Sequence, residues 1–145
     1  MTLHAILIVA GGLVLGQDND VKKELERLQG TWDLVGRELD GKAAAEDDVK
    51  VMEGKLVITG DKATYTSRGD DAREVTFKID PTANPRTIEW TITKGPAKGD
   101  KVLAIYKIEG DRLTICSGPP ETRPKKFVTR PGSPFVIIIW QKQKK

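Results

Sequence analysis

The sequence predicts a mainly β fold, a single antiparallel up-and-down β-barrel of about eight strands with a short N-terminal helix. Three observations predict it. Apolar and polar residues alternate along most of the chain after Gly30, turn residues recur at roughly ten-residue intervals, and two connections are short glycine-aspartate pairs. The length of 145 residues suits one domain with one core, and the composition, 38% hydrophobic and 31% charged, is ordinary for a soluble globular protein.

The start of the chain predicts export. Ala5 to Leu15 form an apolar run that is too short to span a bilayer but has the length of a signal-peptide core. Val14 and Gly16 are small enough for the −3 and −1 positions of a cleavage site. We therefore expect residues 1–16 to be a signal peptide and residues 17–145 to form a periplasmic or extracellular domain.

Two features qualify this expectation. Met1 to His4 contain no Lys or Arg, so a start further upstream and a buried N-terminal strand remain alternatives. Gln17 stands where a lipoprotein needs Cys, so we expect neither a lipid anchor nor stable membrane insertion.

The first helix is expected from Asp20 to Gln29, where apolar residues recur at helical spacing and Gly30 follows as a stop. A second short helix is expected from Ala43 to Met52. The remaining periodic segments predict strands, which we place at Thr31–Leu39, Lys55–Thr59, Lys62–Ser67, Arg73–Ile79, Thr87–Thr93, Lys101–Glu109, Arg112–Cys116, Lys126–Arg130 and Phe135–Gln141.

Hairpin turns are predicted at Gly60-Asp61 and Gly110-Asp111, because glycine supplies the positive φ angle that primed turns require. Most strands alternate and so have one buried face. Val102–Ile108 and Phe135–Trp140 are apolar on both parities instead. These two strands should be covered on both sides, by the N-terminal helix or by a partner.

The chain also resembles a known family. Gly30-x-Trp32 after a short helix is similar to the Gly-x-Trp signature at the mouth of lipocalin barrels. A longer series from Leu25 to Ile139 resembles the uncharacterised lipocalin-like domain family abundant in planctomycete bacteria. The segments that carry it are Asp40-Gly41-Lys42, Leu56 to Lys62, Phe77 to Ala83, Pro85 to Ile88, Ile105-Tyr106, Gly110-Asp111-x-Leu113, Ile115-Cys116 and Arg123-Pro124 with Phe127.

This resemblance implies a small secreted or envelope-exposed lipocalin-like barrel with no established biochemical activity. Lipocalin barrels commonly place an Arg from the last strand across the signature tryptophan, whereas this chain ends Trp140-Gln141-Lys142. Lysine lacks the planar guanidinium that stacks on an indole. We therefore expect closure at this end to be looser, or to be built from Trp140.

Composition argues against catalysis. Without residues 1–16 the chain has no histidine, which excludes Ser-His-Asp and Cys-His nucleophiles and His-containing zinc sites. The sole cysteine, Cys116, lies in an apolar run and reads as a buried hydrophobe. We expect no enzyme, no catalytic residue, no metal site and no cofactor; a glycosidase-like acid pair such as Glu38 with Glu89 needs geometry to test it.

Basic and acidic residues, 24 and 21 in number, are interspersed along the chain and give a net charge of +3, so no nucleic-acid partner is expected. A barrel of about eight strands either fills its interior or holds one small ligand. The three tryptophans, Trp32, Trp90 and Trp140, could line a ligand cavity. The candidate ligand-binding residues on inward faces are Trp32, Tyr65, Phe77, Trp90 and Tyr106, and a basic rim for an anion is suggested by Arg123, Lys125 and Lys126.

The leading hypothesis is a monomeric, exported, non-enzymatic module that binds a small hydrophobic molecule. The alternative is a structural or protein-interaction domain of the cell envelope with a filled core, in which the strand Phe135–Trp140 or its edge docks another envelope protein. The basic stretch has a simpler role open to it as well, with Arg123 bonding exposed carbonyls at a barrel end.

Overall fold

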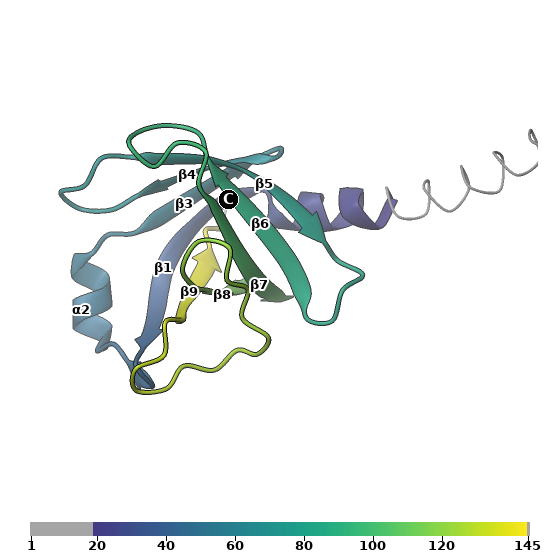
Figure 1. Cartoon of the computed structure of the whole chain (residues 1–145). Helices are drawn as coiled ribbons and strands as arrows, with labels where there is room; N and C mark the ends of the chain where they lie inside the picture. Colours follow the sequence, from purple (N-terminus) through teal and green to yellow (C-terminus); the bar gives the residue numbers. More distant parts are fainter. Residues whose placement is uncertain (1–18, 145) are drawn as a thin grey trace, which may run out of the picture.

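Eight antiparallel strands close into a barrel in the computed structural model, which describes residues 19–144 (Figure 1). Each strand pairs with the next, and the last strand returns to the first to complete the ring. The strands are β1 (Gly30–Leu39), β3 (Lys55–Thr59), β4 (Lys62–Thr66), β5 (Arg73–Asp80), β6 (Arg86–Ile92), β7 (Lys101–Glu109), β8 (Arg112–Ser117) and β9 (Val136–Lys142).

Three further elements complete the fold. Residues 19–28 are helical and lie at one end of the barrel (Figure 1). A two-residue strand, β2 (Lys42–Ala43), extends the far end of β1, and the helix α2 (Glu46–Val51) packs beside it. The signal peptide expected at residues 1–16 lies outside the described residues.

The predicted barrel is therefore confirmed, and eight of the nine expected strands correspond to the eight strands of the barrel. The second helix is shorter than the expected Ala43–Met52, because residues 42–43 pair with β1 instead. Both predicted hairpins are present with two-residue loops. The positive φ falls on the glycine in each, +62° at Gly60 and +61° at Gly110, as in a type II′ turn.

The expected strand Lys126–Arg130 is wrong. Residues 118–135 instead form a long connection between β8 and β9 that crosses the outside of the barrel. Phe127 and Phe135 of this connection pack on outward side chains of β7, β8 and β9, which are Ile105, Cys116, Ile137 and Ile139. This second, outer core explains why strands β7 and β9 are apolar on both parities.

The expectation that these strands are covered on both sides is thus confirmed, but the cover is neither the N-terminal helix nor a partner. Within the connection, Pro124 is fully buried and Thr129 is 6% exposed. The Thr129 hydroxyl donates to Glu38 of β1 at 2.6 Å and accepts from the Gly41 amide at 3.0 Å. These bonds fix the connection to β1.

Cys116 lies in the outer core with no exposed surface, as the sequence predicted. Its Sγ donates to the Lys126 carbonyl at 3.6 Å. Burial raises the pKa of the Cys116 thiol, so the reactive thiolate is disfavoured in the folded protein. The cysteine therefore acts as a packing residue.

Candidate functional site

One half of the barrel interior is filled by side chains at the end where the helix lies. Trp32 of β1 is completely buried there, and its Nε1–H donates to the Leu28 carbonyl at 2.9 Å. Leu28 itself has no exposed surface and packs into the inner core at this end of the barrel. The Gly-x-Trp segment therefore joins the helix to the first strand by packing and by one buried hydrogen bond.

Lys142 takes the position that the lipocalin pattern gives to arginine. Its Nζ lies 5.3 Å from the centre of the Trp32 ring and donates to the Arg27 carbonyl at 3.1 Å. Gly30 makes room for it, since a Cβ there would lie 3.1 Å from Lys142 Cε and the residue has a φ of +123°. Lys142 thus both covers the indole and bonds the end of the helix, although it lacks the planar guanidinium; the looser closure expected from the sequence stays a prediction.

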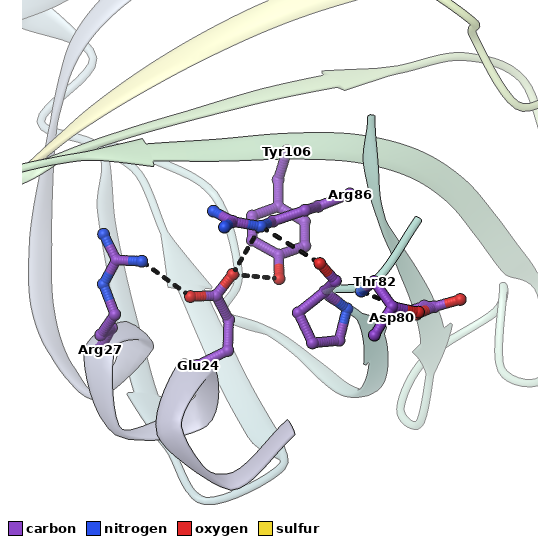
Figure 2. A network of polar contacts seen from close by, with 7 residues as sticks. Glu24, Arg27, Asp80, Thr82, Arg86 and Tyr106 are labelled. Carbon is purple, nitrogen blue, oxygen red and sulfur yellow. Dashed lines mark hydrogen bonds and ion pairs between the residues drawn. The ribbon is translucent and has the colours of Figure 1, made fainter. Parts of the chain in front are cut away.

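A buried carboxylate links the helix to the barrel wall at this end (Figure 2). Glu24 is 4% exposed and accepts a 2.9 Å hydrogen bond from the hydroxyl of Tyr106. It also pairs with Arg27 at 3.0 Å and with Arg86 at 3.3 Å. Arg86 in turn donates to the Pro81 carbonyl, in the turn where Thr82 lowers the pKa of Asp80 through two hydrogen bonds (Figure 2).

Burial, reinforced by the charge and the hydrogen bond of Glu24, raises the pKa of Tyr106 far above its ordinary value of 10.0. The folded chain holds this proton more tightly than the unfolded chain does. The stability from this group is therefore complete below about pH 10 and falls as the pH rises further. Denaturant titrations should show that the free energy of unfolding falls more between pH 8 and pH 11 for the native protein than for Y106F. An equal fall in both proteins would contradict the raised pKa of Tyr106.

The other half of the interior is hollow. A cavity of about 400 Å³ opens at the end of the barrel opposite the helix. Its walls are mainly apolar and come from all eight barrel strands, with Met52 after α2 and Asp70 from the β4–β5 loop at the rim. The wall residues are Leu34, Leu56, Tyr65, Val75, Trp90, Ile92, Val102, Ile115, Ser117, Val136, Ile138 and Trp140, with Arg37 and Arg73.

The five predicted ligand-binding residues divide between the two halves. Tyr65 and Trp90 line the cavity. Trp32, Phe77 and Tyr106 belong to the filled half, where they are 0%, 4% and 1% exposed. Phe77 still contributes to the site indirectly, because its ring packs on Trp90 with centroids 5.2 Å apart.

Trp140 lines the cavity as well, as the sequence suggested for the three tryptophans. Its ring meets Tyr65 edge to face, with centroids 5.8 Å apart and planes at 79°. Its strand is apolar on both parities, so alternation alone does not tell which side chains of β9 point inward. Trp140 pairs with Leu34 on β1 and with Leu113 on β8, and because both of these side chains belong to the inner core, Trp140 also points inward.

The basic stretch after β8 lies on the outside of the barrel. Arg123, Lys125 and Lys126 line a surface hollow of about 360 Å³ beside Phe135. The guanidinium of Arg123 donates to two main-chain carbonyls, those of Ile88 on β6 and Ala104 on β7. Arg123 thus has the structural role that the sequence left open, and it ties the connection to the barrel wall.

The candidate acid pair is ruled out by position. Glu38 lies on β1 and Glu89 on β6, and three strands separate them on either side of the ring. Glu38 accepts from Thr129, and Glu89 pairs with Lys101 at 3.1 Å. Two carboxylates on opposite walls cannot flank one glycosidic bond.

Within residues 19–144, no cluster of three or more His, Cys, Asp or Glu side chains is placed to hold a metal ion. Over the same range, no helix is both long enough and apolar enough to cross a membrane. No protein-family model matches this chain, and a search of curated proteins finds no significant match either.

Proposed function

We propose that this chain is an exported, non-enzymatic, lipocalin-like module that binds a small, largely apolar molecule in the cavity at the open end of its barrel. One observation carries the proposal: Trp32 and Tyr106 are buried at the helix end of the interior, whereas a cavity of about 400 Å³ bordered by Trp90 and Trp140 opens at the other end. Barrels of this size either fill their interior or hold one ligand. Here the filled half serves as the floor of a pocket.

The dimensions and chemistry of the cavity support this proposal. A volume of about 400 Å³ lies within the usual range for small-molecule sites, roughly 300–1,000 Å³. Its wall is mostly aliphatic and aromatic, and polar groups such as Ser117 and Tyr65 are few. Such a wall favours a ligand that gains affinity by leaving water.

The apolar run at residues 5–15 and the resemblance to secreted lipocalin-like domains support export. The alternative of an interaction domain has less support from the geometry. It requires a filled core and an open strand at Phe135–Trp140, whereas β9 pairs with β8 on one edge and with β1 on the other. Its outer side chains pack under Phe127 and Phe135.

Filling the cavity provides the test. V102W places an indole on the cavity wall beside Trp90, the cross-strand partner of Val102, while V57W adds the same side chain on the outer face of β3, where Val57 is 41% exposed. We expect the neutral fluorescent probe N-phenyl-1-naphthylamine to bind the native protein and V57W alike. V102W should bind it at least about tenfold more weakly, since the probe and the indole compete for one space.

Fluorescence titration measures both affinities, and circular dichroism checks that each variant is folded. Equal binding by V102W and V57W would place the probe elsewhere on the protein. If the native protein did not bind the probe, the proposed function would be contradicted.

A further inference from the structure

Two arginines stand at the mouth of the cavity and face inward. Arg37 pairs across β1 and β9 with Ile138, and Arg73 pairs across β4 and β5 with Tyr65. Paired residues in neighbouring strands share a face of the sheet, and Ile138 and Tyr65 both line the cavity. Both guanidinium groups therefore belong to the rim of an apolar pocket.

The two arginines approach the mouth from different walls. Strands β3 and β4 separate β1 from β5 in the ring, so Arg37 and Arg73 frame the opening rather than adjoin one another. Met52 and Asp70 occupy the rim beside them, and the Arg68 amide donates to the Met52 carbonyl at 2.8 Å. This bond ties the β4–β5 loop to the end of α2 at the opening.

Neither arginine has a counter-ion within the described part of the chain. Other basic side chains on the strands do: Lys101 pairs with Glu89 at 3.1 Å, and Lys55 with Asp33 at 3.3 Å. Asp70 is the one carboxylate that lines the cavity in residues 19–144, and it accepts a hydrogen bond from Ser67 at 3.1 Å. The rim thus carries more positive than negative charge above an apolar interior.

We infer that the ligand is an amphiphile with a single anionic head group, held at the mouth by Arg37 and Arg73 while its apolar tail enters the barrel. This inference rests on the proposed function and adds the charge of the ligand to it. Guanidinium groups bind carboxylate, sulfate and phosphate oxygens through paired N–H donors. The apolar wall below them selects for a tail, so small inorganic anions gain little from the site.

A pair of probes separates the two claims. Dodecanoate and dodecanol have the same tail and differ in head-group charge, so the alcohol reports the cavity and the acid reports cavity and rim together. We expect the native protein to bind dodecanoate about tenfold more tightly than dodecanol, since each exposed ion pair contributes up to about fivefold. The double variant R37Q/R73Q should lose this preference and bind dodecanol as before.

Two further variants sharpen the test. R112Q removes one positive charge at the helix end of the barrel, where Arg112 is exposed, and should leave the preference unchanged. D70N removes the rim carboxylate and should strengthen dodecanoate binding only. Isothermal titration calorimetry measures all of these affinities.

The outcomes are distinguishable. If both probes bind with equal affinity, or if R37Q/R73Q weakens both to the same extent, the inference about charge is overturned and the proposed cavity function stands. If neither probe binds the native protein, the proposed function fails and the inference fails with it.

Discussion

W32A is expected to lower the free energy of unfolding by about 3–5 kcal/mol, the usual cost of truncating a large buried aromatic side chain. Trp32 has no exposed surface, and its indole joins the helix, the first strand and Lys142 through one hydrogen bond and one cation–π contact. The variant leaves a void between these parts. Equilibrium denaturation in urea, followed by circular dichroism, measures the loss.

The matched control is W90A, the same substitution in the hollow half. Trp90 borders the cavity and is only partly buried, so fewer contacts are lost on truncation. We expect W90A to cost less than W32A by about 1 kcal/mol or more. Equal losses at the two positions would contradict the division of the interior into a filled and a hollow half.

E24A is expected to cost about 2 kcal/mol, because the buried hydroxyl of Tyr106 then loses its hydrogen-bond partner. The two arginines that pair with Glu24 contribute less to this figure. Their side chains are 47% and 41% exposed and can return to water. Thermal or urea unfolding at neutral pH gives the value.

Two other variants test that reasoning. E26A truncates an exposed glutamate on the same helix and should change stability by less than about 0.5 kcal/mol. The double variant E24A/Y106F removes both partners and should be less destabilised than the sum of its single changes. If the changes in the free energy of unfolding of the two single variants simply added up in the double variant, the hydrogen bond between Glu24 and Tyr106 would not contribute to stability.

The fold was predictable because its signals are local. Alternation, hairpin glycines and helical spacing each act within a few residues, and they agree with the eight strands of the barrel. The error at Lys126–Arg130 has a non-local cause. Phe127 packs on the outer core and Thr129 is buried beside β1, so a loop that covers a sheet carries the same alternating pattern as a strand.

The site was predictable only in part, since alternation tells which face a residue occupies but not how far the packed core extends along the barrel. Tyr65 and Trp32 both point inward, yet one borders the cavity and the other is sealed in. The helix that plugs one end makes the difference, and its docking depends on contacts such as that between Glu24 and Tyr106.

Of the two rim arginines, one has an inward orientation that the sequence pattern predicts and the other does not. Arg73 shares the parity of Val75 and Phe77, so extending the alternation by one step places it inward. Arg37 has the opposite parity to Leu34 in the sequence. A register shift between Leu34 and Gly36 in the pairing of β1 with β9 places Arg37 on the inner face. The sequence pattern does not predict such a bulge.

The most direct test of the account is native mass spectrometry of the chain purified without denaturation from its own cell envelope, with V57W and V102W prepared alongside. Our account predicts a retained small molecule on the native protein and on V57W, released as an anion on activation, and none on V102W. The bare polypeptide mass for all three proteins, or an equal adduct on V102W, would contradict it.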